Sequence, residues 1–336
     1  MKSLVWTGPR QLEMVDSDVP EPKEGELLLR VCMVGICGSE LSGYLGENSL
    51  RNPPLVMGHE FSAIVTSIGK GVNNWVVGQR VTVNPLISCG ACRPCQNGNG
   101  QLCRHREIIG INRPGAFAEY VTVPASACYS FEHSLEGALV EPLACAVRAN
   151  NQAGIEFGDN VAIFGAGIIG LMSLKIAQIM GANQRIVIDT NERRLKKAQE
   201  WGATEVLNPS TTMIKQEVLH LCPDGVDKSI DAVGMPQTRF DSVSVVRPGG
   251  RVVFIGLHND ITELPGNLIV RQETQIAGSF CYSDEDFHRA LNILKQGMIS
   301  TVGDWLDIRS LSDARDSFEE QIFGPAEYPK IILKVY

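Results

Sequence analysis

Three glycines spaced as G-x-G-x-x-G, at Gly165, Gly167 and Gly170, constrain more strongly than any other feature what this chain can fold into. They follow an apolar run that predicts a buried strand, and they open a segment with helical periodicity. In this context Gly165 permits the tight turn, Gly167 lets the backbone approach a pyrophosphate, and Gly170 allows close packing of helix on strand. The motif therefore predicts a Rossmann-type dinucleotide site, with the phosphates at the helix N-terminus.

The alternation of strand and helix continues after the glycines, which predicts a parallel sheet with right-handed crossovers. Asn191 is the expected N-cap of the second helix. The chain before residue 145 is instead rich in short Val- and Ile-containing runs that indicate a β-rich domain. We expect an α/β protein with three segments: a β-rich domain at 1–145, a Rossmann domain at 146–280, and a return to the first domain at 281–336.

Asp189 ends the strand that follows the glycine-rich turn, nineteen residues after Gly170. A carboxylate there accepts hydrogen bonds from both ribose hydroxyls of NAD and repels the 2′-phosphate of NADP. The alternative is that Asp189 only caps the next helix. Arg193 and Arg194 stand at the start of that helix, where they are expected on a solvated face or against the adenosine rather than on a 2′-phosphate.

Four of the ten cysteines lie between residues 89 and 103, spaced C-x-x-C-x-x-C-x7-C: Cys89, Cys92, Cys95 and Cys103. A chain of 336 residues with no apolar signal core does not need disulfides, so the spacing favours an all-thiolate zinc site over disulfides or redox-active thiols. Four thiolates fill the tetrahedral shell and leave no open position. This lobe, 89–103, is therefore expected to be structural, and catalysis must take place elsewhere.

A second set of metal-binding side chains lies outside the lobe: Cys37 in "GIC", His59 and Glu60 in "GHE", and Glu141 in "EP". Taken singly, a cysteine in an apolar strand is usually a core residue and a histidine is usually a hydrogen-bonded polar residue. Together they offer one sulfur, one nitrogen and two carboxylate donors. A catalytic zinc ion uses about three such ligands and keeps one position open.

The composition limits the kinds of partner that the protein is expected to bind. Charged residues make up 20% of the chain and the net charge is −8, which argues against a nucleic-acid binder. The longest apolar run is interrupted by glycine and is too short to cross a bilayer. We therefore expect a cytoplasmic protein that binds neither nucleic acid nor membrane.

These motifs, in this order, resemble the zinc-dependent medium-chain alcohol dehydrogenase superfamily over essentially the whole chain. The carboxylate at Glu141 resembles the residue pattern of the sorbitol or polyol branch of this superfamily. The resemblance implies a GroES-like catalytic domain, a Rossmann coenzyme domain, two zinc ions per chain, NAD, and a homo-oligomer that is a dimer or a tetramer.

The resemblance also implies roles for individual residues. Cys37 and His59 bind the catalytic zinc, Glu60 and Glu141 bind it directly or through its water, and Ser39 begins the proton relay. The expected coenzyme contacts are Gly165, Gly167, Ile169, Gly170, Asp189, Arg194, Val233, Ile255, Leu257 and Ser279. Three positions depart from the family pattern, and one of them, Ala63 in place of a glycine, implies only local repacking. Glu40 replaces the usual Asp that orients the histidine, and Cys281 replaces a substrate-pocket Arg of the sorbitol enzymes, so sorbitol itself is in doubt.

The expected reaction is hydride transfer from a secondary alcohol of a polyol or sugar-alcohol derivative to NAD, with zinc promoting loss of the hydroxyl proton. A threonine 3-dehydrogenase-like or small-diol dehydrogenase is the enzyme alternative. A zinc- and NAD-binding regulator without catalysis is the alternative from another class.

Overall fold

The computed structural model describes residues 1–325 and 327–336. It contains two compact units: the first comprises Met1–Glu141 and Ser283–Tyr336, and the second comprises Pro142–Tyr282. The second unit is thus inserted into the first. The boundaries predicted from the sequence, after residues 145 and 280, lie within a few residues of these divisions after Glu141 and Tyr282.

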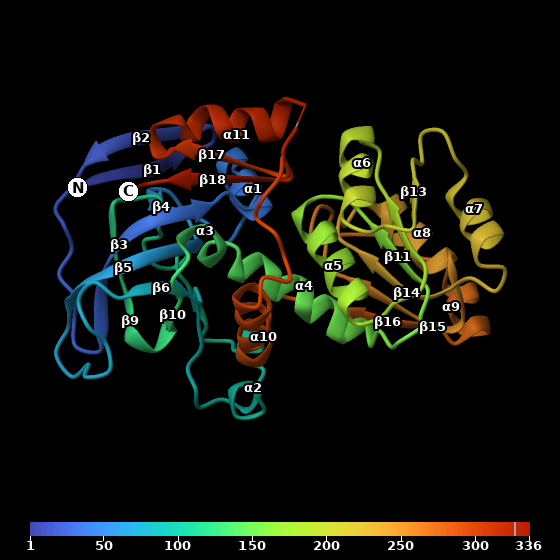
Figure 1. The fold of residues 1–336 in the computed structure, drawn as a ribbon, viewed down its shortest axis with the longest axis horizontal. Helices are drawn as coiled ribbons and strands as arrows, with labels where there is room; N and C mark the ends of the chain where they lie inside the picture. Colours follow the sequence, from blue (N-terminus) through green and yellow to red (C-terminus); the bar gives the residue numbers. More distant parts are fainter. Residues whose placement is uncertain (326) are drawn as a thin grey trace. The chain divides into compact units, whose positions relative to one another are not determined.

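The first unit is built on a mostly antiparallel sheet whose strands follow the order β10-β6-β5-β3-β18-β17, with β9 also paired to β3 (Figure 1). These strands are β3 (Glu26–Gly35), β5 (Glu60–Ile68), β6 (Arg80–Val83), β9 (Tyr120–Pro124), β10 (Cys128–Ser130), β17 (Leu306–Ser310) and β18 (Lys330–Lys334). A three-stranded sheet contains β1 (Lys2–Gly8), β2 (Gln11–Asp16) and β4 (Leu55–Val56). A two-stranded sheet contains β7 (Leu86–Ile87) and β8 (Glu107–Ile108). The helices are α1 (Gly38–Leu45), α2 (Arg93–Gln96), α3 (Ser134–Gly137), α10 (Asp284–Lys295) and α11 (Ala314–Phe323).

Strand β3 is the centre of this unit, because it pairs with β5, β9 and β18. Its apolar side chains Leu27, Leu29 and Val31 are fully buried, so burial of the apolar core sets its register. At its carboxyl end Gly35 lies opposite both Glu60 of β5 and Ile332 of β18. Three segments far apart in sequence therefore meet at this corner of the sheet.

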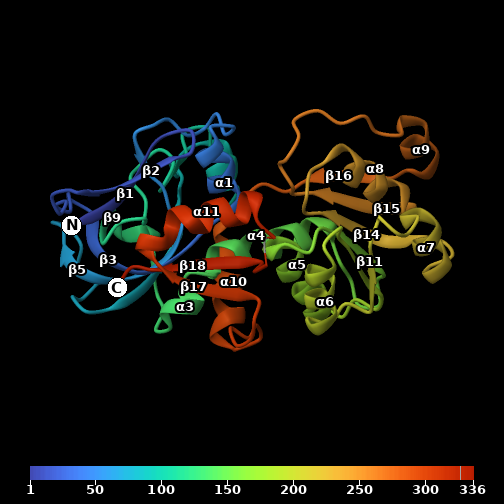
Figure 2. The same ribbon diagram turned by 90° about the horizontal axis from the view of Figure 1, so that it is seen from above.

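The second unit is a six-stranded parallel sheet in the order β13-β12-β11-β14-β15-β16. In order along the chain this is 3-2-1-4-5-6, the doubly wound order of dinucleotide-binding folds, which confirms the predicted Rossmann class. Figure 2 shows α5 and α6 on one side of this sheet and α8 on the other. The strands are β11 (Val161–Phe164), β12 (Arg185–Ile188), β13 (Glu205–Leu207), β14 (Val226–Asp231), β15 (Val246–Phe254) and β16 (Gln275–Gly278). The helices are α4 (Val140–Ala153), which begins in the first unit, α5 (Ile168–Ile179), α6 (Glu192–Glu200), α7 (Ile214–Leu221), α8 (Pro236–Ser244) and α9 (Gly266–Gln272).

Local sequence signals account for the elements around the glycine motif. All four residues of β11 are buried, as a central parallel strand requires. Asn191 caps α6 as predicted, because its side-chain oxygen accepts the N–H groups of Arg193 at 2.9 Å and Arg194 at 3.2 Å. Across the described residues, no helix combines the length and apolar character needed to cross a membrane.

Candidate functional site

The structure brings Cys37, His59 and Glu60 together at the corner where β3 ends and β5 begins. Cys37 is the N-cap of α1, directly after β3, and His59 precedes the first residue of β5. The ligand atoms of the three side chains lie within 4.8 Å of one another. One thiolate, one imidazole and one carboxylate at this spacing fit a zinc ion with an open fourth position.

Glu40 orients His59 despite the longer side chain noted in the sequence. Its Oε1 lies 2.8 Å from His59 Nδ1 and accepts the Gly58 N–H at 2.8 Å, and its Oε2 accepts the Cys37 N–H at 3.0 Å. Burial lowers the pKa of His59, but Glu40 and Cys37 outweigh it, so the His59 pKa lies well above its usual value in the metal-free protein. With Nδ1 held by Glu40, the other ring nitrogen is left for a metal.

Glu60 also pairs with a lysine that the sequence motifs do not indicate. Lys330 of β18 is fully buried, and its ammonium group donates to Glu60 Oε2 and to the Ile36 carbonyl, the latter at 2.9 Å. Burial lowers the pKa of Lys330, but the Glu60 carboxylate and the Cys37 thiolate outweigh it, and the Lys330 pKa is raised. Gly35 makes room for this pair, since a Cβ there would overlap the Lys330 stem. Lys330 thus anchors one oxygen of Glu60 and balances its charge.

Ser39 lies beside the candidate metal ligands, on the first turn of α1. Its hydroxyl donates to Cys37 Sγ at 3.4 Å and accepts from Arg51 Nη2 at 3.2 Å. Arg51 is a second residue missed by sequence reasoning, because nothing in "SLRNPP" distinguishes it from a surface arginine. A hydroxyl in this position can exchange a proton with an alcohol bound at the metal.

Glu141 is not part of the group formed by Cys37, His59 and Glu60. It is buried, with 7% of its surface exposed, in the first turn of α4. The described residues whose ligand atoms gather here do not include it. Of the two carboxylates expected to bind the metal, only Glu60 belongs to this group among the described residues, and the ligand role of both stays a prediction.

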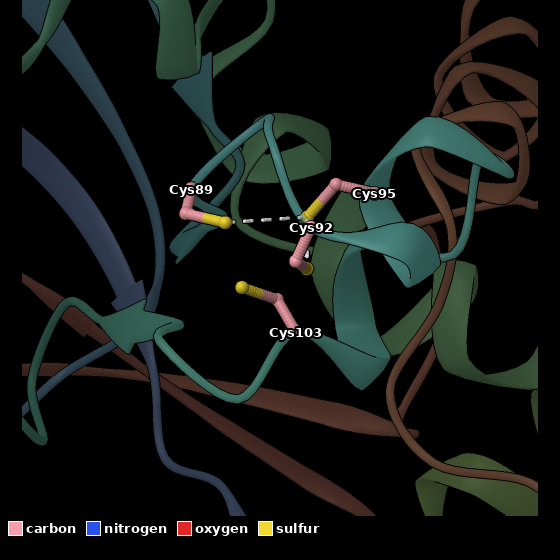
Figure 3. Close-up of side chains that lie close together, drawn as sticks. All are labelled: Cys89, Cys92, Cys95 and Cys103. Carbon is pink, nitrogen blue, oxygen red and sulfur yellow. Dashed lines mark hydrogen bonds between the residues drawn. The ribbon is translucent and has the colours of Figure 1, made fainter.

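The four cysteines of the 89–103 lobe point their sulfur atoms toward one another (Figure 3). Cys95 Sγ lies 3.4 Å from Cys92 Sγ and 4.0 Å from Cys89 Sγ. These separations are far longer than a disulfide bond and are close to the ~3.8 Å between two sulfurs of a tetrahedral zinc–thiolate site. Backbone N–H groups of Ala91 and Cys92 lower the pKa of the Cys89 thiol to about 6, which favours the thiolate that a metal requires. The lobe therefore fits a closed zinc site.

The glycine-rich turn has the geometry that its spacing predicts. Gly165 has φ 95°, in the left-handed region, and a Cβ there would lie 2.7 Å from Val233 Cγ2. A Cβ on Gly170 would overlap the Gly165 carbonyl, so α5 packs against the turn through bare backbone. A Cβ on Gly167, the N-cap of α5, would have no atom within 4 Å. The turn thus leaves open space at the helix N-terminus, as a pyrophosphate site requires.

Asp189 follows β12 and faces this turn. Its Oδ2 accepts the Ala166 N–H at 2.7 Å, and its Oδ1 accepts the Asn191 N–H at 2.8 Å. Asn191, and not Asp189, supplies the side-chain cap of α6. This arrangement favours a coenzyme role for Asp189 over a purely capping one.

The other expected coenzyme contacts lie around the carboxyl ends of the strands, where doubly wound sheets bind ligands. Val233 follows β14, Ile255 and Leu257 follow β15, and Ser279 follows β16. Ser279 is 7% exposed, and its hydroxyl has no hydrogen-bond partner among the described residues. Leu257 is 79% exposed. Ile169 lies half-buried in the first turn of α5. The buried Nε of Arg194 makes no hydrogen bond to any residue that the structure describes.

Comparison with known proteins identifies the family of the chain. Residues 23–133 match the alcohol dehydrogenase GroES-like domain, and residues 169–296 match the zinc-binding dehydrogenase domain. The chain is 30% identical to the sorbitol dehydrogenase of Bacillus subtilis, over 99% of this chain and 97% of that protein.

Two solved structures share the whole fold. A zinc-binding dehydrogenase from Sinorhizobium meliloti bound to NADP superposes with a TM-score of 0.93 at 32% identity, covering 99% of both chains. An alcohol dehydrogenase (rspB) from Escherichia coli CFT073 complexed with NADH has a TM-score of 0.93 at 28% identity, covering 100% of this chain and 99% of that one. The protein therefore belongs to the zinc-dependent medium-chain alcohol dehydrogenase superfamily.

Proposed function

We propose that this protein oxidises a secondary alcohol of a polyol or sugar-alcohol derivative, with NAD as the electron acceptor and two zinc ions per chain. The observation that carries the proposal is the gathering of Cys37, His59 and Glu60 beside the Ser39 hydroxyl. One thiolate with harder nitrogen and oxygen ligands makes a more polar site than a two-thiolate set, which suits a substrate with several hydroxyls. The similarity to a sorbitol dehydrogenase supports the same substrate class.

The side chains around the candidate metal site have separate roles in the proposed oxidation. A bound zinc ion supplies Lewis acidity, which makes the substrate hydroxyl more acidic. Cys37, His59 and Glu60 would hold the metal, and Glu40 fixes the orientation of the His59 ring. Glu141 stays a candidate ligand. Ser39 would receive the hydroxyl proton at Oγ and pass its own proton to solvent water, so that the serine hydroxyl is regenerated.

The choice of NAD rests on Asp189. Its carboxylate lies at the glycine-rich turn, where it accepts the Ala166 N–H, and a negative charge there disfavours a 2′-phosphate. The two similar structures do not decide the matter, since one holds NADP and the other NADH. Assembly as a dimer or tetramer is also part of the proposal, and light scattering after gel filtration measures it.

The test is the absorbance of reduced nicotinamide when zinc-loaded protein is mixed with NAD and a panel of polyols, phosphorylated polyols, aldonic acids, small diols and L-threonine. Ser39→Ala is expected to lower kcat by about 10²–10⁴-fold, because it removes the proton acceptor. Ser42→Ala on the same helix is the matched control, since its hydroxyl donates to the Ser39 carbonyl at 3.0 Å and accepts from Asn48 Nδ2 at 3.5 Å, and so bonds to neither Cys37 nor Arg51 within the described residues. Oxidation of L-threonine or a small diol alone, or wild-type turnover by Ser39→Ala, would contradict the proposal.

A further inference from the structure

We propose that Arg51 binds an anionic group of the substrate, so that the polyol carries a carboxylate or a phosphate a few carbon atoms from the oxidised hydroxyl. This inference deepens the proposed function, on which its substrate class rests. It begins from an arginine that is 3% exposed and forms no ion pair within the described residues.

The hydrogen bonds of Arg51 leave most of its donors unused. Nη2 donates to Ser39 Oγ at 3.2 Å, whereas Nε and Nη1 are buried and make no hydrogen bond within the described chain. A buried guanidinium is normally paired with a carboxylate, because burying an unpaired charge costs several kcal/mol. The unsatisfied charge therefore points to an acceptor that the protein itself does not provide.

Arg51 interacts electrostatically with Glu40, but within the described residues no hydrogen bond joins the two side chains. Oε1 of Glu40 is occupied by His59 Nδ1 and the Gly58 N–H, and its Oε2 is occupied by the Cys37 N–H. No ion pair within 4.0 Å joins Arg51 to any acidic side chain of the described residues. The positive charge of Arg51 is thus available to a ligand.

Gly43 of α1 holds Arg51 in this position. A Cβ at Gly43 would lie 2.6 Å from Arg51 Cδ and 3.3 Å from Nε, so the arginine stem crosses the helix where no side chain is present. The guanidinium ends at Ser39, whose hydroxyl contacts Cys37 Sγ. It is therefore placed to bind a group near the reacting carbinol, and its planar fork matches a carboxylate or a phosphate.

The experiment compares kcat/KM for sorbitol, gluconate and sorbitol 6-phosphate in wild type, Arg51→Gln and Arg51→Lys. We expect wild type to prefer at least one of the two anions over sorbitol. Arg51→Gln should lower kcat/KM for that anion about 10–100-fold more than for sorbitol, and Arg51→Lys should retain part of the preference. The anion whose kcat/KM depends on Arg51 shows whether the charged group of the substrate is a carboxylate or a phosphate. Arg80→Gln is the matched control, because Arg80 also donates to a serine hydroxyl, that of Ser134 at 2.7 Å, but is exposed.

Equal losses for all three substrates would overturn the inference and make Arg51 a positioning residue for Ser39. An effect confined to the Kd of NADH would overturn it in favour of a coenzyme phosphate. Calorimetric titration of zinc-loaded protein with gluconate and with sorbitol 6-phosphate separates this inference from the proposed function, because it needs no turnover. Binding of either anion that Arg51→Gln weakens supports the anion site even if no polyol is oxidised. Oxidation of sorbitol without any dependence on Arg51 supports the proposed function alone.

Discussion

Replacement of Lys330 by Met should destabilise the first unit by about 3–5 kcal/mol in zinc-free protein. The side chains of Lys330 and Glu60 are 0% and 1% exposed, so neither charge has access to water. Removing one partner of such a pair leaves an uncompensated buried charge, which typically costs that much. Methionine keeps the apolar stem, so the loss reports the ammonium group and its bonds to Glu60 and the Ile36 carbonyl.

The assay is urea unfolding followed by tryptophan fluorescence in a Trp201→Phe background. Of the four tryptophans, Trp6, Trp75 and Trp305 belong to the first unit and Trp201 to the second, so this background reports the first unit alone. Lys2→Met is the matched control: Lys2 also pairs with an acid, Asp16 at 2.8 Å, but on the surface, and its loss should cost no more than about 1 kcal/mol.

Zinc should shrink the deficit of Lys330→Met, because the metal supplies positive charge beside Glu60. Adding Glu60→Gln to Lys330→Met should likewise restore part of the lost free energy of unfolding, since it removes the unpaired charge. A loss below 1 kcal/mol in the zinc-free single variant would refute the reasoning, and the pair would then make no net contribution to stability.

The remaining predictions concern the lobe, the coenzyme and a surface ion pair. Cys92→Ser should lose one zinc ion by elemental analysis and lower the thermal midpoint, whereas Cys37→Ser should lose the other zinc ion together with turnover; an unchanged zinc content in Cys92→Ser would contradict the lobe assignment. Asp189→Ala should lower the ratio of kcat/KM for NAD over NADP by about 10–100-fold, and an unchanged ratio would leave the carboxylate without a coenzyme role. Burial raises the pKa of Asp227, but its bond to Arg247 Nε at 2.6 Å and a backbone N–H outweigh it, so the folded pKa is lowered. Asp227→Asn should therefore cost roughly 0.5–1 kcal/mol above about pH 4, and the difference from wild type should vanish in urea titrations as the pH falls below that value.

Signals that act within a few residues could be recognised in the sequence. The glycine turn, β11, α5 and the Asn191 cap all depend on neighbours close in the chain, and the structure has each of them. The Rossmann class follows from their order. The short strand β13 and the helix α7 are not among the predicted elements, because one has three residues and the other carries only two buried side chains.

The roles of Lys330 and Arg51 could not be predicted, for a physical reason. A lysine in "YPKIILKVY" is indistinguishable from an alternating surface residue until β18 is placed beside β3. Arg51 lies in a loop, and its burial depends on the bare backbone of Gly43. In both cases the charge is explained only by contacts that tertiary folding creates.

The pairing of β18 with β3 also sets an order of events during synthesis. Glu60 and Lys330 are 270 residues apart, and the whole inserted unit lies between them in the chain. A growing chain therefore makes Cys37, His59 and Glu60 long before it makes the cation that anchors Glu60. During that interval the carboxyl end of β3 lacks its β18 partner and presents unpaired backbone groups. Zinc that binds before β18 pairs with β3 finds a Glu60 carboxylate that Lys330 does not yet hold. Zinc that binds after this pairing finds the carboxylate already hydrogen-bonded to Lys330. Once Lys330 has been made, a folded inserted unit shortens the flexible chain between Glu60 and Lys330, which lowers the entropic cost of pairing β18 with β3 and completing the metal site.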